Sequence, residues 1–279
     1  MPTTTASISG DYVAVDGVRL WVERAGEGPV LLLIPGLGTG NWLWRSLAAS
    51  LAGTFTLVMP ELRGSARSDK PDQPYTVPLF ASDLLAVLDH FHIDRTHVLG
   101  ASMGGFIAQH LAATAPSRVM RLVLVATSLG GARQIGPEGS ILARTIRPRG
   151  RSRRERLEDG YELGFSPAFR AAHREQLHTI TEWRLSHPQP EWAYYRQLLA
   201  GWAFDGVQAA QAIEARTLIC AAEEDPVVPI ANAYALRDHI PTSRLALFKG
   251  RHLFVIEHYE NVARAVTQFL LDGTTGERA

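Results

Sequence analysis

The chain has 279 residues, of which 46% are hydrophobic, and 28 Lys and Arg residues balance 28 Asp and Glu residues. A chain of this length and composition buries a sizeable core, as one large domain or as a domain with an insertion. A formal net charge of zero gives no global field that would recruit nucleic acid or an anionic membrane. We therefore expect neither as a partner.

The N-terminal residues and the apolar runs bear on where the protein works. Residues 1–7 show neither the basic region nor the apolar core of a signal peptide. The longest apolar runs, such as residues 30–34, are too short to span a bilayer. The single cysteine, Cys220, lies in an apolar run typical of a buried strand and can form no disulfide within the chain. We expect a cytoplasmic protein.

Strand and helix signals alternate along much of the chain. Segments 12–15 and 18–24 flank an Asp16-Gly17 turn and predict a β-hairpin. Segments with helical spacing of apolar residues follow most of the later apolar runs, for example at 42–51, 79–91 and 106–115. Because those runs are apolar throughout, they predict a mainly parallel sheet covered by helices. The predicted strands of this kind are 30–34, 55–59, 97–99, 122–125, 217–221 and 245–248.

Residues 128–213 interrupt this alternation. The segment has no convincing buried strand, most of it has helical patterning, and it lies between two predicted core strands. We therefore predict a core made of residues 1–127 and 214–279, with residues 128–213 inserted as a helical cap.

A serine flanked by glycines follows the predicted strand 97–99. Residues 100–104 read Gly-Ala-Ser-Met-Gly and fit the pattern G-x-S-x-G, in which a tight strand-to-helix turn exposes the serine hydroxyl. Glycines at 100 and 104 leave room for the sharp turn. The N-terminus of the following helix favours a developing oxyanion. Ser102 is therefore the candidate nucleophile.

Two further candidate side chains follow predicted strands near the end of the chain. Asp225 lies in the acidic turn after strand 217–221, where a carboxylate could orient a histidine, although Glu223 and Glu224 compete for this role. His252 lies in a glycine-containing loop after the last predicted strand, where a base could reach a nucleophile. The three residues then form a candidate Ser-His-Asp triad.

A glycine-rich turn at residues 34–38 follows the first of the buried strands. Glycines allow backbone N–H groups to face a pocket, so the N–H groups of Leu37 and Met103 are candidates for a two-donor oxyanion hole. Taken alone, the turn fits an ordinary strand-to-helix connection equally well. A phosphate-binding loop is disfavoured because no lysine follows at the required spacing.

Over nearly its whole length the chain resembles the α/β-hydrolase superfamily, and its core is most similar to the esterase, enol-lactonase and cofactor-free haloperoxidase branch. The resemblance implies an eight-stranded, mainly parallel sheet flanked by helices, with an inserted helical cap. It also implies a hydrolase with Ser102 as nucleophile, His252 as base and Asp225 as the orienting acid. The motifs that carry the resemblance are Pro35-Gly36-Leu37-Gly38, Glu61-Leu62-Arg63-Gly64-Ser65-Ala66-Arg67-Ser68, Gly100-Ala101-Ser102-Met103-Gly104-Gly105, Glu224-Asp225-Pro226 and Gly250-Arg251-His252.

Three positions in these motifs differ from the usual residues of the family. Pro35 replaces a histidine, Glu61 an aspartate and Ala66 a glycine. These changes leave the candidate triad intact and affect the region beside the candidate oxyanion hole.

A serine at position 102 favours an acyl substrate, because dehalogenases and epoxide hydrolases of this fold are expected to carry Asp there. We predict hydrolysis of a small or medium hydrophobic carboxylic ester or lactone through an acyl-enzyme on Ser102. No cofactor is expected, and no Cys/His cluster has metal-ligand spacing. Aromatic residues suggest an apolar pocket, although helix packing is a competing role for each. The candidate pocket residues are Trp42, Trp44, Trp183 and Trp202.

Other functions stay open at this point. A C–C bond hydrolase, a lyase or a cyclase could use the same triad, and a catalytically silent relative could bind a ligand. An arginine-rich run could bind nucleic acid or an acidic carrier protein, but interspersed acidic residues favour a solvated cap loop. The run comprises Arg144, Arg147, Arg149, Arg151, Arg153, Arg154 and Arg156.

Overall fold

A computed structural model describes residues 7–137 and 152–272 of the chain. Eight strands form one sheet in the order β1-β2-β4-β3-β5-β6-β7-β8, the fold class expected from the sequence. β2 pairs in the antiparallel direction with β1 on one side and with β4 on the other, and the remaining neighbouring strands are parallel. The strands are β1 (Ser9–Val15), β2 (Val18–Ala25), β3 (Val30–Ile34), β4 (Thr56–Pro60), β5 (Thr96–Ala101), β6 (Val119–Val125), β7 (Thr217–Ala222) and β8 (Ser243–Phe248).

The turn and the strands have the conformations that their residues favour. Asp16 and Gly17 take φ angles of 43° and 77°, as expected for the tight turn of the β1-β2 hairpin. Every residue of β5 and β7 is buried, as is typical of strands in the middle of a parallel sheet. Cys220 is one of these buried residues, and burial raises the pKa of its thiol to about 12.

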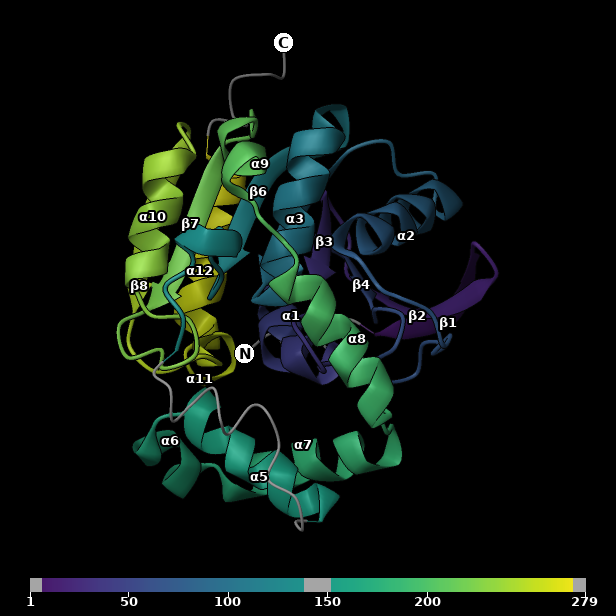
Figure 1. Cartoon of the computed structure of the whole chain (residues 1–279), viewed down its shortest axis with the longest axis vertical. Helices are drawn as coiled ribbons and strands as arrows, with labels where there is room; N and C mark the ends of the chain where they lie inside the picture. The colour runs from purple at the N-terminus through teal and green to yellow at the C-terminus, as the bar shows by residue number, and fades with distance from the viewer. Residues whose placement is uncertain (1–6, 138–151, 273–279) are drawn as a thin grey trace.

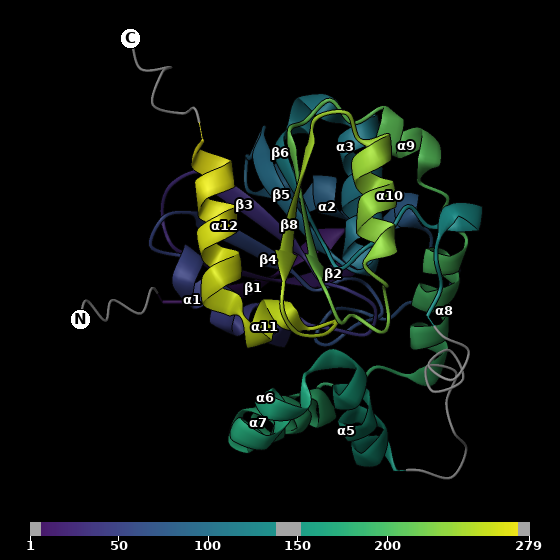
Figure 2. The same ribbon diagram turned by 90° about the vertical axis from the view of Figure 1, so that its left-hand side faces the viewer.

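Helices cover both faces of the sheet (Figure 1, Figure 2). One hydrophobic cluster joins the sheet to α2 (Val77–His90), α3 (Met103–Thr114) and α10 (Ala231–His239). A second cluster joins the opposite face to α1 (Arg45–Leu51), α11 (Phe254–Glu257) and α12 (Tyr259–Leu271). The chain thus forms three layers, with the sheet in the middle.

The described residues between β6 and β7 form helices and add no strand to the sheet. They are η3 (Gly131–Arg133), α5 (Arg153–Gly164), α6 (Pro167–Ala172), α7 (Arg174–Ser186), α8 (Glu191–Trp202) and α9 (Val207–Gln211). Helices α5, α6 and α7 form a layer at one end of the sheet, and α8 leads from it back to the core (Figure 1, Figure 2). Helix α9 packs on α3, and Phe204 before it stacks on Phe106 of α3 with ring centroids 4.9 Å apart. The cap boundaries at 128 and 213 stay a prediction.

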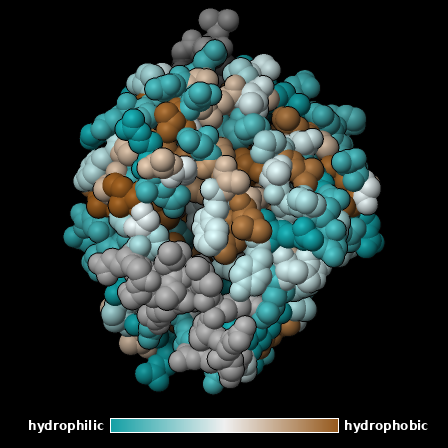
Figure 3. All heavy atoms as spheres, viewed as in Figure 1, coloured by the Kyte–Doolittle hydropathy of each residue, from teal (hydrophilic) through white to brown (hydrophobic). Residues whose placement is uncertain are grey.

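In the part of the chain that is described, no helix is both long and apolar enough to cross a membrane. On the face shown in Figure 3, apolar residues form scattered groups among polar ones.

Candidate active site

Ser102 occupies a strained turn between β5 and α3. Its φ and ψ angles are 54° and −120°, a conformation that non-glycine residues rarely adopt. A Cβ atom at Gly100 would lie 2.3 Å from the carbonyl oxygen of Gly104, and one at Gly104 would lie 2.2 Å from that of Ile34. Only glycine at both positions allows the helix to approach the strand this closely. The predicted G-x-S-x-G turn thus has the tight geometry that the pattern requires.

A continuous chain of hydrogen bonds joins the three candidate triad residues. His252 Nε2 lies 3.2 Å from Ser102 Oγ, and His252 Nδ1 lies 2.8 Å from Asp225 Oδ2. The other carboxylate oxygen of Asp225 accepts the N–H groups of Val227 and Val228, at 2.8 and 2.9 Å. A carboxylate at Nδ1 fixes the tautomer in which Nε2 can accept the serine proton.

The competing acids lie elsewhere. Glu223 forms an exposed ion pair with Lys249, with 2.7 Å between Oε2 and Nζ. Glu224 is also exposed, whereas the Asp225 side chain is only 1% exposed. Among the three acidic candidates, the structure therefore brings Asp225 to the histidine.

Leu37, one of the two candidate oxyanion donors, lines a small cavity beside Ser102. The cavity has a volume of about 70 Å³ and is lined by Leu37, Ser102 and His252 among other residues. Met103 is the first residue of α3, where N–H groups have no acceptor within the helix. The N–H of Leu37 donates to no other described residue, whereas that of Gly38 donates to Gln197 Oε1 at 3.1 Å. The Leu37 N–H is therefore available at this cavity, and Met103 directly follows Ser102, which lines it.

Gln197 on α8 is a site residue that the sequence analysis missed. Its side chain is fully buried, and its Nε2 donates to the Arg63 carbonyl at 2.9 Å and to Ser65 Oγ at 2.8 Å. Together with the bond from Gly38, these contacts attach α8 to the loop that carries Leu37. The available signal was a polar residue on a buried helical stripe, since Ala193 and Ala200 lie on the same face.

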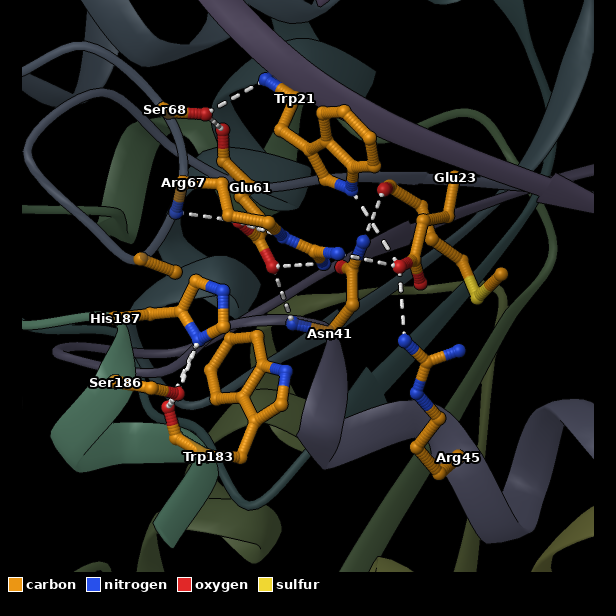
Figure 4. A network of polar contacts seen from close by, with 12 residues as sticks. Trp21, Glu23, Asn41, Arg45, Glu61, Arg67, Ser68, Trp183, Ser186 and His187 are labelled. Atoms are coloured by element: carbon orange, nitrogen blue, oxygen red, sulfur yellow. Dashed lines mark hydrogen bonds and ion pairs between the residues drawn. The ribbon is translucent and has the colours of Figure 1, made fainter. Parts of the chain in front are cut away.

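Glu61 lies at the centre of a buried network beside this loop (Figure 4). One of its oxygens accepts the Asn41 N–H at 3.1 Å and pairs with Arg67 at 2.6 Å. Glu23, also buried, pairs with Arg45 and Arg67, at 2.8 Å each. Two carboxylates therefore face two guanidinium groups, so the charges of this group of four side chains balance.

The same network reaches the cap. The Arg67 guanidinium lies 4.6 Å from the ring of Trp21 and 5.3 Å from the ring of Trp183 on α7. Burial alone would lower the pKa of Arg67, but its bonds to Glu61 and Glu23 raise the pKa above its usual value. At the position where the family usually has aspartate, Glu61 thus ties Asn41, next to the candidate oxyanion loop, to an arginine that contacts the cap.

A much larger cavity, of about 720 Å³, lies between the loop after β3 and the cap. Two of the candidate pocket residues, Trp42 and Trp183, line it, and Thr39 borders both this cavity and the one at Ser102. Several of the other lining side chains are charged, so the lining combines apolar, aromatic and charged side chains, and the apolar substrate pocket stays a prediction. The charged residues are Arg153, Arg156, Asp159, Glu162, Arg184 and Glu191.

Two of the predicted pocket residues do not line this cavity. Trp44 is wholly buried in the hydrophobic cluster beneath α1 and α12. It lies two residues after Trp42 on a 3₁₀ turn (η1, Asn41–Trp44), so the two rings leave the backbone in different directions. Trp202 is the last residue of α8 and is 53% exposed.

The arginine-rich run is only partly described. Arg144, Arg147, Arg149 and Arg151 lie outside the described residues. Arg154 pairs with Glu182 at 2.6 Å and with Glu158 at 3.7 Å, and Arg156 pairs with Glu191 at 3.6 Å. The nearby acidic residues therefore engage both of these arginines.

The comparison with known families agrees with this architecture. Residues 29–259 match the family model described as the alpha/beta hydrolase fold. The chain belongs to the α/β-hydrolase family.

Individual relatives in the family are distant or partial. Uncharacterised mycobacterial proteins are 42% identical over 123 residues, which span 43% of this chain and only 35% of their own length. A poly(3-hydroxyalkanoate) depolymerase from Ectopseudomonas oleovorans is 27% identical over 86% of this chain and 83% of its own length. The 3-oxoadipate enol-lactonase 2 of Acinetobacter baylyi is 26% identical, with 92% and 94% covered.

A solved structure shares the whole fold. The enol-lactonase from Burkholderia xenovorans has a TM-score of 0.84 with 24% identity, and the match covers 94% of this chain and all of that chain. At this identity the likeness concerns the fold alone.

Proposed function

We propose that this α/β-hydrolase family member is a serine hydrolase that cleaves a carboxylic ester or lactone through an acyl-enzyme on Ser102. The observation that carries the proposal is the unbroken hydrogen-bonded chain from Ser102 through His252 to Asp225. The names of two relatives, a poly(3-hydroxyalkanoate) depolymerase and an enol-lactonase, also favour ester or lactone chemistry.

The geometry suggests how the reaction would proceed. Ser102 Oγ attacks the carbonyl carbon while His252 Nε2 takes the hydroxyl proton, and Asp225 stabilises the resulting imidazolium. The carbonyl oxygen becomes an oxyanion, which the N–H groups of Leu37 and Met103 can bind. His252 then protonates the leaving alcohol oxygen, and water repeats the sequence to release the acid and free Ser102.

The test is hydrolysis of p-nitrophenyl esters from acetate to decanoate. We expect Ser102→Ala and His252→Ala each to lower turnover by several orders of magnitude, on the order of a million-fold where a triad acts as a unit. Ser50→Ala and His178→Ala change exposed residues and serve as matched controls. Folded wild-type protein without activity on any of these esters or on simple lactones would contradict the proposal, as would full activity of Ser102→Ala.

A further inference from the structure

Arg184 on α7 is a cation beneath the cap that the proposed reaction does not use. It lines the large cavity together with Trp42, Trp183 and Tyr194. Its guanidinium lies 5.0 Å from the centroid of the ring of Trp42, which is four residues after the candidate oxyanion loop. This contact places a positive charge in a partly enclosed space that adjoins the Ser102 cavity at Thr39.

No acidic side chain among the described residues lies within ion-pair distance of Arg184. By contrast, Arg156 on the same cavity pairs with Glu191, and Arg154, also on α5, pairs with Glu182 and Glu158. Burial lowers the pKa of the Arg184 guanidinium, although the Tyr161 and Tyr194 side chains act in the opposite direction. Arg184 is thus partly buried beside two tyrosine side chains, and no carboxylate of the described residues pairs with it.

An anion bound in the cavity would supply the negative charge that these tyrosines do not. A buried charge costs free energy unless it is paired, and a guanidinium is a weakly hydrated planar fork suited to bidentate carboxylate binding. A cation–π contact engages the face of this fork, so its N–H groups, which lie along the edge, can donate to a ligand as well as to Tyr161. A volume of about 720 Å³ is ample for a small dicarboxylic acid derivative.

We propose that Arg184 binds a carboxylate on the substrate, so that the preferred esters or lactones carry a second, ionised carboxyl group away from the scissile bond. The inference rests on the proposed function of Ser102 for its catalytic part. The binding of a carboxylate by Arg184 can be tested without it.

The catalytic test compares two esters that differ only at the end of the acyl chain. Mono-p-nitrophenyl adipate carries a terminal carboxylate, and p-nitrophenyl hexanoate has the same chain length without it. We expect wild-type kcat/KM to favour the adipate ester by about tenfold or more, as for one charge-assisted hydrogen-bonded pair. Arg184→Met should abolish this preference mainly through KM, and Arg184→Lys should retain part of it.

The control is Arg156→Met, which removes a paired arginine from the same cavity and should leave the preference intact. A preference that Arg184→Met does not change, or equal losses on both esters, would overturn the proposal. The melting temperature of each variant separates these outcomes from unfolding, and Arg184→Gln is the alternative if Arg184→Met does not fold.

The binding test needs no ester hydrolysis. Sodium adipate is titrated into Ser102→Ala protein, with tryptophan fluorescence as the readout because Trp42 and Trp183 line the cavity. We expect saturable binding of adipate to the Ser102→Ala protein, and binding about tenfold or more weaker to the double variant that also carries Arg184→Met. If no ester is hydrolysed but this Arg184-dependent binding is seen, the proposed reaction fails and the carboxylate site stands. Adipate binding that ignores Arg184, or tighter binding of inorganic phosphate than of adipate, would overturn the site.

Discussion

At the scale of single residues, buried titratable side chains determine how the protein responds to acid. His97 on β5 is 2% exposed, packs against the edge of Phe55, and its Nδ1 has no hydrogen-bond partner among the described residues. Burial, together with the charge of Arg121, lowers the pKa of His97 to about 4. The ordinary value in an unfolded chain is about 6.5. The unfolded state therefore binds the proton more readily than the folded state.

This difference predicts a specific loss of stability in acid. Neutral His97 contributes fully to the free energy of unfolding above about pH 6.5. As the pH falls towards 4, protonation of the unfolded chain lowers this free energy by up to about 3 kcal/mol. We expect His97→Phe to lose less free energy of unfolding than wild type between about pH 7 and pH 4.5, measured by urea denaturation. His178→Phe, at an exposed histidine, should behave as wild type. Parallel pH profiles for wild type and His97→Phe would show that burial of His97 has no such effect.

At the scale of elements, the contact between α8 and the loop after β3 is the most informative. Gln197 accepts the Gly38 N–H while it donates to the Arg63 carbonyl and to Ser65. Gly38 has a φ of 66°, and a Cβ atom there would lie 3.1 Å from the Tyr194 ring. The conformation of Gly38 and its hydrogen bond to Gln197 on α8 thus hold the loop in place. Together they fix the direction of the neighbouring Leu37 N–H.

We therefore expect Gln197→Leu to lower kcat for ester hydrolysis by about tenfold to a hundredfold while changing KM little, because oxyanion donors act mainly in the transition state. Gln197→Glu keeps an acceptor for the Gly38 N–H and should retain more activity. Gln208→Leu on α9 changes an exposed glutamine and is the control. A lower melting temperature with unchanged kcat would assign Gln197 a structural role only.

The contrast between the candidate triad and the candidate pocket shows what could be predicted from the sequence. In a parallel sheet the carboxyl ends of the strands share one edge, so residues that directly follow β5, β7 and β8 meet there once the strands are recognised. The direction of Trp44 and Trp202 depends on helical phase and packing, which spacing alone does not fix. Arg184 and Gln197 belong to no sequence motif, and their contacts form only when the cap packs on the core.

At the scale of the whole molecule, the helical insertion shares its hydrophobic clusters with the core. Ala200, Phe204 and Ile213 belong to the cluster that includes α2 and α3. Phe165 and Ile180, in the α5–α7 layer, belong to the cluster on the other face of the sheet. Both clusters thus extend from the core into the insertion, and neither part buries its apolar side chains alone.

This continuity predicts that cap and core unfold together. We expect differential scanning calorimetry at neutral pH to show one transition, with equal calorimetric and van't Hoff enthalpies. Limited proteolysis should not remove the α5–α7 layer while leaving a folded core. Two resolved transitions, or a stable core after cleavage within α5–α7, would indicate separate folding units.

The burial of Cys220 has a practical consequence for spectroscopy. With a thiol pKa of about 12 and a position inside β7, this side chain offers almost no thiolate to a maleimide reagent in the native state. A cysteine introduced at the exposed position of His178 on α7, paired with a second one at Ser50 on α1, would therefore carry dyes without removal of the natural residue. Single-molecule measurements of the distance between α7 and α1 could therefore start from the native sequence.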